Sequence, residues 1–366
     1  MTTLRVILDD IIAGGNGRLA RYSEDLTRAL IRTAPRGADV AGYVSASPES
    51  DYALLRERLP GLRDLHKSAL ARRELAAAWQ HGFTVLPGSG MVHSTSLLAP
   101  MRKHDRGAGG SDQCVVTIHD AIAWTHPDLL PSRQVSWTKA MAKRAERYAD
   151  AVVVPTHAVA AELGEILDFG DRVRVIGGAP GSSLEVPFDA ATRRTRLGLP
   201  SRYVVALVEG DPHNGFADLA TAAASPALAD ATVVLLAAAG EPAHIEGADR
   251  LTTLEDLGVD DRVAVLAGAT VYVQPSLAAG FGAGMLDAMS LGLPVIATDV
   301  PALAETAADA AEFVAPGAPA ALADALAALL HDPTAADQLG VAAGDRAKAF
   351  TWRDAAEKVW QLHADL

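Results

Sequence analysis

The sequence predicts an α/β protein of two domains, each built on a parallel sheet, with the two sheets facing each other across a cleft. Short β-branched runs alternate with longer stretches of helical periodicity along the chain, which is typical of βαβ units and parallel sheets. This alternation occurs in two successive series. A length of 366 residues also corresponds to about two domains of ordinary size. The prediction is therefore two Rossmann-like halves.

The first series predicts an N-terminal domain over residues 1–183. Its strand candidates are six short apolar runs: Leu4–Leu8, Val40–Val44, Val92–His93, Val115–Ile118, Val152–Val154 and Val173–Ile176. Between them, apolar residues recur at the spacing of an amphipathic helix. The helix candidates are Gly17–Thr33, Asp51–Leu59 and Trp137–Ala149. The segment Ser182–Asp189 is the expected linker, with Pro187 as its hinge.

The second series predicts a C-terminal domain over residues 184–350. Its strand candidates are Tyr203–Val208, Thr232–Ala237, Val263–Leu266, Val271–Val273, Pro294–Ala297 and Glu312–Val314. Its helix candidates are Phe216–Ala223, Met285–Ser290 and Pro319–Leu330. A last helix, about Trp352–Ala364, is predicted because Thr351 is followed by Asp354, an arrangement that caps a helix start. Residues 351–366 are expected to pack back on the N-terminal domain.

Composition excludes several classes of protein. Hydrophobic residues make up 49% and charged residues 21% of the chain, as in globular proteins rather than disordered ones. The single cysteine, Cys114, excludes an intrachain disulfide and a cysteine-based zinc site. No apolar stretch approaches the roughly 20 residues of a membrane span, and Asp9 and Asp10 directly after the first apolar run argue against a signal peptide. A cytoplasmic protein is expected.

The net charge of −13 is unevenly distributed. Residues 1–200 carry 25 Lys and Arg against 22 Asp and Glu, whereas residues 201–366 carry 7 against 23. A contrast of this size indicates two domains of different character. The acidic half argues against a nucleic-acid partner, because such binding depends on Lys and Arg neutralising phosphates.

The glycine-rich loop after the first strand is one candidate site, because ligands of open parallel sheets bind at the carboxyl ends of strands. It contains Gly14, Gly15 and Gly17, with Arg18 at the start of the next helix. Gly15 and Gly17, with Ala20, match the alanine form of the dinucleotide fingerprint. The acid that binds the ribose is absent at the end of the second strand. A ligand loop of another kind and a structural turn are therefore the other interpretations.

Two further loops carry a histidine. His119 follows the strand Val115–Ile118, at a position where it can hold a substrate hydroxyl or phosphate oxygen; a histidine satisfied within its own loop is the alternative. His213 and Asn214 follow the strand Tyr203–Val208 and precede a helix, whose N–H groups can meet an anion. An ordinary turn is the alternative there.

The fourth loop supplies the most informative pattern. The run Val271-Tyr272-Val273-Gln274-Pro275-Ser276 is followed by Ala279-Gly280-Phe281-Gly282 and then by Met285-Leu286-Asp287-Ala288-Met289. It resembles the C-terminal signature of the retaining glycosyltransferases of family 4, whose fold is called GT-B. In that family Pro-Ser is followed by Glu-Gly-Phe-Gly and by a second Glu in a helix ending Ala-Met. Thr117-Ile118-His119-Asp120 is similar to the His-Asp strand end of its bacterial mannosyl- and rhamnosyltransferases.

The resemblance implies transfer of a sugar from a nucleotide-diphosphate donor to a glycan or lipid-linked acceptor, with retained anomeric configuration, usually without a metal and with no other cofactor. A GDP-mannose-like donor is expected. The resemblance implies His119 as the catalytic residue and places the N-terminal loop, with Gly14, Gly15, Gly17 and Arg18, at the cleft. The implied donor-binding residues are Ser276, Gly280, Phe281, Gly282, Asp287, His213 and Asn214.

The chain departs from the family at important positions. Ala279 stands where the family has its first Glu, which contacts the donor sugar, and Asp287 stands where it has the second, which holds the ribose. His213 and Asn214 fall where the family has an Arg and a Lys that neutralise the pyrophosphate. Removing one such donor typically costs about 10²–10³ in rate.

These departures leave three interpretations. The first is an active transferase in which Arg18 or Arg21 replaces the lost cations, since no Lys or Arg lies between Arg202 and Arg250. The second is a catalytically impaired relative that acts as a binding or partner protein. The third is another sugar-nucleotide enzyme of the same fold, such as an epimerase.

One segment looks too short for the fold. Val263–Leu266 runs almost straight into Val271–Val273, and a crossover between parallel strands needs a dozen or more residues. Strain or rearrangement is therefore expected around residues 265–270.

A basic helix raises the question of membrane contact. Trp137 and Met141 lie four residues apart in a stretch that carries Arg133, Lys139, Lys143, Arg144 and Arg147. Basic amphipathic helices can lie on an anionic lipid surface. A solvated face whose apolar side packs in the core is the alternative.

Overall fold

The computed structural model describes residues 2–13, 17–83, 88–104, 112–208, 212–237 and 250–366. The chain divides into two compact units, which are described separately. Unit 1 comprises Met1–Gly178 and Thr351–Leu366, and unit 2 comprises Ala179–Phe350. The predicted linker Ser182–Asp189 therefore lies in unit 2, where it contains no helix or strand until α8 begins at Ala190.

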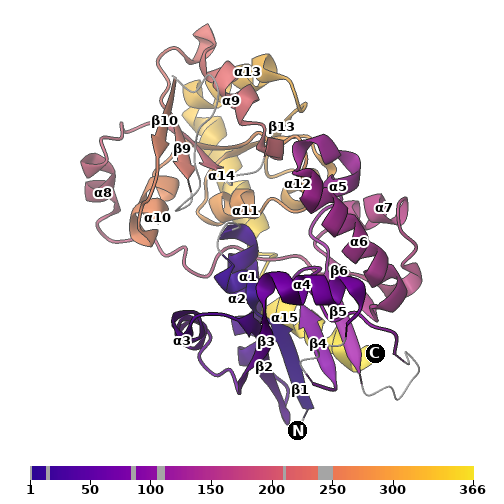
Figure 1. Ribbon diagram of the computed structural model, residues 1–366. Coiled ribbons are helices and arrows are strands. Elements are labelled where there is room, and N and C mark those ends of the chain that lie inside the picture. The colour runs from indigo at the N-terminus through magenta and orange to yellow at the C-terminus, as the bar shows by residue number, and fades with distance from the viewer. Residues whose placement is uncertain (1, 14–16, 84–87, 105–111, 209–211, 238–249) are drawn as a thin grey trace. The chain divides into compact units, whose positions relative to one another are not determined.

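Unit 1 is built on a seven-stranded parallel sheet with the order β3-β2-β1-β4-β5-β6-β7 (Figure 1). The strands are β1 (Thr2–Ile7), β2 (Ala38–Ala46), β3 (Leu65–Ala71), β4 (Met91–Ser94), β5 (Gln113–Thr117), β6 (Ala151–Val154) and β7 (Val173–Val175). The six predicted strands are all present, and β3 is an additional edge strand that the sequence pattern missed. All pairs in this sheet are parallel.

Helices cover both faces of this sheet. The helices are α1 (Asp9–Ile12), α2 (Gly17–Arg32), α3 (Glu49–Arg58), α4 (Arg72–His81), α5 (Ile122–Thr125), α6 (Ser132–Tyr148), α7 (His157–Gly164) and α15 (Trp352–Asp365). Helices α2, α3 and α15 share one apolar core with β1 and β2, while α4, α6 and α7 pack in the cores that contain the opposite faces of the strands. Burial on both faces is what a parallel sheet requires.

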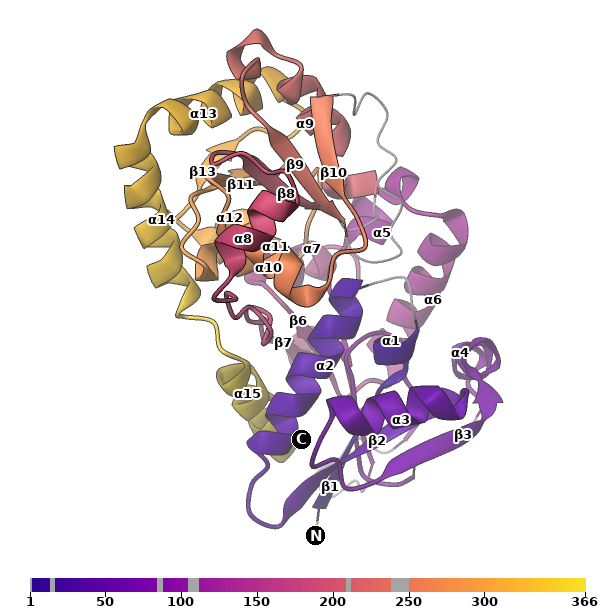
Figure 2. The same cartoon turned by 90° about the vertical axis from the view of Figure 1, so that its left-hand side faces the viewer.

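The C-terminal helix α15 is part of unit 1, beside α2 (Figure 2). The Thr351 side chain caps it as predicted, accepting a hydrogen bond from the Asp354 amide at 3.1 Å. The Trp360 indole is buried and donates to the Leu30 carbonyl at 3.1 Å. The last residues therefore complete the core of the first unit.

Unit 2 is built on a six-stranded parallel sheet with the order β10-β9-β8-β11-β12-β13. The strands are β8 (Val204–Val208), β9 (Val233–Ala237), β10 (Leu251–Leu254), β11 (Val271–Gln274), β12 (Val295–Thr298) and β13 (Glu312–Val314). The helices are α8 (Ala190–Arg196), α9 (Phe216–Ala223), α10 (Val259–Ala267), α11 (Ala283–Ser290), α12 (Pro301–Ala307), α13 (Pro319–His331) and α14 (Pro333–Ala347). Both sheets confirm the predicted α/β class of two parallel-sheet domains.

One predicted strand is wrong. Val263–Leu266 forms the buried side of helix α10, with every residue of the run below 5% exposure. The strand that precedes β11 is instead β10, which pairs in parallel with β9 at the edge of the sheet. Helix α10 therefore supplies the crossover from β10 to β11, and the expected strain around residues 265–270 is also wrong.

Candidate functional site

Both sheets contain a point at which the strand order reverses. In unit 1 the chain builds β2 and β3 on one side of β1 and then places β4 on the other side; in unit 2 it does the same with β9 and β10 on one side of β8 and β11 on the other. Ligands of open parallel sheets bind at the carboxyl ends of the strands that flank such a switch point. Every described residue of the predicted site lies in a loop or helix that follows one of these strands or, for His119, the neighbouring strand β5.

His119 is held at the switch point of unit 1. Its Nε2 lies 2.7 Å from the carbonyl oxygen of Thr95, which follows β4, and the Tyr22 ring meets the imidazole edge-on at 4.8 Å. Burial lowers the pKa of His119, so the ring is neutral at physiological pH. Since Nε2 faces a carbonyl, it carries the proton, and Nδ1 offers a lone pair that can accept a hydrogen bond from a hydroxyl.

Two buried carboxyl groups stand at the same edge of the sheet, directly after β1. Asp9 accepts from the Ser45 amide at 3.2 Å, and burial raises the pKa of this carboxyl. Asp10 accepts a charge-assisted hydrogen bond from Arg72 at 2.9 Å. Sequence reasoning took these two acids only as evidence against a signal peptide. Their position after the first strand of a parallel sheet was the signal that would have marked them.

Only part of the predicted N-terminal loop can be placed. Gly14 and Gly15 lie outside the described residues. Gly17 begins α2, is exposed, and has room for a side chain, because no atom lies within 4 Å of an ideal Cβ there. Arg18 follows in the first turn of α2, and its positive charge contributes to lowering the pKa of His119.

In unit 2, the loops after β8 and β11 are locked together through backbone. The Leu277 amide donates to the His213 carbonyl at 2.7 Å. Gly215 has φ of 69°, and a Cβ there would lie 1.8 Å from the Pro275 carbonyl oxygen, so only glycine fits this position. His213 and Asn214 are brought to the switch point, but both side chains are buried.

Ser276 ends a polar ladder on one side of β11. The Tyr272 hydroxyl donates to Gln274 Oε1 at 2.6 Å, and Gln274 Nε2 donates to Ser276 Oγ at 2.7 Å. The next helix packs closely over this ladder, since a Cβ on Gly284 would lie 2.9 Å from the Tyr272 hydroxyl. All three side chains of the ladder are buried, which fixes the start of the glycine-rich loop.

The glycine-rich loop leads into helix α11. Gly282, at the N-cap, has φ of 83°, and a Cβ there would lie 2.5 Å from Leu303 Cδ2. Gly280 precedes Phe281, whose ring packs edge-on against Phe350 at 5.8 Å. Close packing against these side chains holds the start of α11 at the carboxyl edge of the sheet, where the free N–H groups of a helix N-terminus favour an anion.

Asp287 is in α11 but makes a structural contact. Its side chain is 1% exposed, and Oδ1 accepts a hydrogen bond from the Gly181 amide at 2.9 Å. The carboxylate thus ties the helix to the segment that opens unit 2. Sequence reasoning could not foresee this bond, because its partners lie 106 positions apart.

The basic helix α6 uses its apolar side within unit 1. Met141, Ala142 and Ala145 are buried in the core, and Lys143 pairs with Glu146 one turn along. This arrangement is that of a solvated face over a core. No described helix is long and apolar enough to cross a membrane.

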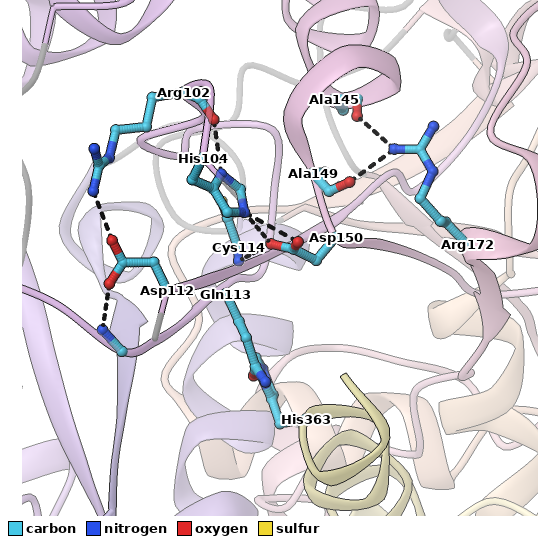
Figure 3. A network of polar contacts seen from close by, with 11 residues as sticks. Arg102, His104, Asp112, Gln113, Cys114, Ala145, Ala149, Asp150, Arg172 and His363 are labelled. Atoms are coloured by element: carbon cyan, nitrogen blue, oxygen red, sulfur yellow. Dashed lines mark hydrogen bonds and ion pairs between the residues drawn. The ribbon is translucent and has the colours of Figure 1, made fainter. Parts of the chain in front are cut away.

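A second polar network lies at the opposite, amino-terminal edge of the unit 1 sheet (Figure 3). His104 Nδ1 lies 2.8 Å from the Arg102 carbonyl oxygen, and His104 Nε2 lies 2.8 Å from Asp150 Oδ2. Asp150 also accepts from the Cys114 amide at 2.7 Å. The His104 imidazole is therefore held by hydrogen bonds at both of its ring nitrogens. Burial raises the pKa of the Cys114 thiol to about 12, so the cysteine is a structural residue.

Within the described ranges, no group of three or more His, Cys, Asp or Glu side chains is arranged to hold a metal ion.

Two Rossmann-like units, each with a strand-order reversal, define the GT-B class of two-domain α/β proteins. The model described as Glycosyltransferase Family 4 matches residues 19–178, and the model described as Glycosyl transferases group 1 matches residues 203–332. Together these matches span most of the chain. The chain belongs to glycosyltransferase family 4.

Individual proteins agree with this assignment. The chain is 30% identical over 245 residues to a D-inositol 3-phosphate glycosyltransferase of Nocardia farcinica, which covers 59% of this chain and 54% of that protein. The chain spans about half the length, or less, of the curated relatives it matches.

Solved structures share the fold over the whole chain. Sucrose-phosphate synthase from Thermosynechococcus elongatus has a TM-score of 0.72 at 20% identity, covering 100% of this chain and 99% of that chain. HepE of Anabaena, solved in complex with UDP-glucose, has a TM-score of 0.69 at 15% identity and 100% coverage of both chains. At these identities the likeness shows the fold alone.

Proposed function

We propose that this protein transfers a hexosyl group from a nucleoside-diphosphate sugar to a hydroxyl of a glycan or lipid-linked acceptor, with retained anomeric configuration and without a metal. The observation that carries this proposal is that each unit places suitable groups at the carboxyl ends of its strands. In unit 1 this is the neutral His119, whose Nδ1 has an available lone pair. In unit 2 it is the glycine-rich loop that begins helix α11. Family membership supports the reaction class. The impaired-relative interpretation is not favoured, because the relatives that match are named as transferases.

The donor is bound by unit 2 in this proposal. The pyrophosphate meets the backbone N–H groups at the start of α11 and the loop after β8, since the side chains available there carry no full positive charge. Backbone donors of this kind, held by packing, need no reorganisation when negative charge develops on the leaving group. A GDP-mannose-like donor is proposed from the His119-Asp120 strand end.

His119 is the catalytic residue of the proposal. With its Nε2 committed to the Thr95 carbonyl, Nδ1 accepts a hydrogen bond from a hydroxyl of the reacting sugar and orients it. The reaction is placed in the cytoplasm, and membrane contact through α6 is left out of the proposal.

The test is calorimetric titration of the protein with GDP, UDP, GDP-mannose and UDP-glucose, first without and then with a divalent metal. Binding of one nucleotide in the micromolar range supports the proposal, and selective binding of GDP-mannose supports the donor. A folded protein that binds none of the four overturns it. An acceptor search then follows, with His119→Ala as the inactive control.

A further inference from the structure

The ion pair between Asp10 and Arg72 bears on the acceptor. Asp10 lies in α1, directly after β1, and its side chain is 3% exposed; Arg72 begins α4 and is 45% exposed. The two are joined at 2.9 Å through Asp10 Oδ1. Both belong to unit 1, at the carboxyl edge of its sheet. The guanidinium charge at this edge is therefore already compensated by a carboxylate.

The second oxygen of Asp10 has no hydrogen-bond partner. Oδ2 is buried, and among the described residues no donor reaches it. Buried polar atoms are nearly always paired, and a carboxylate oxygen left unpaired costs more than a neutral group. A ligand hydroxyl would supply the missing donor.

The electrostatic field at this edge is set by acids. The negative charges of Asp120 and Asp10 each raise the pKa of His119. The positive charge of Arg18 lowers this pKa, but by less than either acid raises it. Asp9 stands beside Asp10, and Arg72 pairs with Asp10 while its charge also acts on Asp9. A dianionic group brought here would meet like charge, while a neutral hydroxyl would not.

We infer that the acceptor subsite of unit 1 takes an uncharged, hydroxyl-bearing group. The hydroxyl donates a hydrogen bond to Asp10 Oδ2, and the ion pair with Asp10 keeps Arg72 from binding a phosphate. This inference rests on the proposed function. It separates the chain from relatives such as the one from Nocardia farcinica, whose name specifies a phosphorylated inositol.

The test compares inositol with D-inositol 3-phosphate as acceptor probes, in binding and in transfer, in the wild type and in Asp10→Asn. The wild type is expected to favour inositol by about tenfold or more. Asp10→Asn releases Arg72, so the preference shifts toward the phosphate by about tenfold, the effect of one charge-assisted hydrogen bond. Arg72→Gln added to Asp10→Asn should abolish the gain, and Arg73→Gln should leave it intact.

A wild type that binds the phosphate better, or binds neither probe, overturns the inference, as does an Asp10→Asn variant that gains nothing for phosphate. Nucleotide titration on the same samples reports whether each variant is folded and whether the donor half of the proposed function holds. If Asp10→Asn does not fold, the preference of the wild type alone decides. Loss of nucleotide binding in the wild type is a failure of the proposed function, distinct from these outcomes.

Discussion

The two switch points have the same topology but are built from different chemistry. At the first, ionisable side chains gather: Asp9, Asp10, Arg72 and His119 are held by hydrogen bonds at the strand ends. At the second, glycines and backbone carbonyls decide the geometry, and Asp287 is turned inward to Gly181. One fold therefore supports a site made of side-chain charge and a site made of backbone shape.

Because of this difference, the two units should be sensitive to different kinds of substitution. A side-chain site responds to pH and to changes of charge, because burial has shifted the pKa values of Asp9 and His119. A backbone site responds to added volume, because close packing leaves no space for a Cβ. Variants that change only charge should therefore act in unit 1, and variants that change only bulk should act in unit 2.

The largest effect is expected from Gly215→Ala. The substitution places a methyl group into the Pro275 carbonyl in a left-handed conformation, and these two costs together amount to about 2–5 kcal/mol. Chemical denaturation should report this loss of unfolding free energy, together with lost nucleotide binding. Gly198→Ala is the matched control, because Gly198 has φ of 72° with nothing within 4 Å. Equal losses in the two variants would contradict a site built on backbone packing.

Replacement of His119 by alanine should lower turnover by about 10²-fold or more while leaving nucleotide affinity unchanged, because the donor is assigned to unit 2. Steady-state kinetics and calorimetry measure the two quantities. His126→Ala, an exposed histidine on the same connection, is the control and should be silent. A His119→Ala variant that loses nucleotide binding instead would contradict the assignment of donor binding to unit 2 and of the catalytic residue to unit 1.

Acid should destabilise unit 1 through His93. Burial lowers the pKa of His93 to about 4, and that of its neighbour His363 also lies well below 6.5. The unfolded chain therefore takes up the proton first, so stability present above pH 6.5 is lost as the pH falls toward 4. For His93 alone this loss is about 3 kcal/mol.

Chemical denaturation between pH 7 and pH 4 measures how the free energy of unfolding changes with pH. The substitution His93→Gln should reduce this dependence. The comparison with the variant removes the contribution of Asp9, which has the opposite sign because burial raises its pKa. An unchanged slope in His93→Gln would rule out this histidine as the acid-sensitive group.

The smallest effect concerns Asp287. Asp287→Ala removes the acceptor of the Gly181 amide and should cost about 1–3 kcal/mol of unfolding free energy, while Asp287→Asn keeps an acceptor oxygen and should recover most of it. Asp324→Ala, at an exposed position of α13, controls for loss of an acid. If nucleotide affinity falls more than stability in both Asp287 variants, the carboxylate serves the ligand after all.

The fold was predictable because, in most helices and strands, the spacing of apolar residues along the segment itself indicates the type of element. The helix Phe216–Ala223 and the strand Glu312–Val314 have the predicted bounds. The edge strands β3 and β10 were missed because polar residues interrupt their apolar runs: His66, Lys67 and Ser68 in β3, and Thr252 and Thr253 in β10. The run Val263–Leu266 misled because a fully buried apolar run has no polar face to reveal its period.

The site was only partly predictable. Strand-end position marks His119, Ser276 and the glycines, because topology alone carries them to one edge of a sheet. The bond of Asp287 to Gly181 and the pair of Asp10 with Arg72 join residues far apart in sequence. Such bonds depend on side-chain reach in three dimensions, which no spacing along the chain encodes.

Because helix α15 completes unit 1, the order of synthesis and the order of folding differ. Every residue of unit 2 has to be made before α15 leaves the ribosome, whereas unit 2 is continuous in sequence and can fold as it emerges. At the usual 5–20 residues per second, the nascent first unit waits roughly 10–40 s with the partners of Trp360 uncovered. That interval exposes apolar surface around Leu30, which makes the half-made chain a natural client for chaperones.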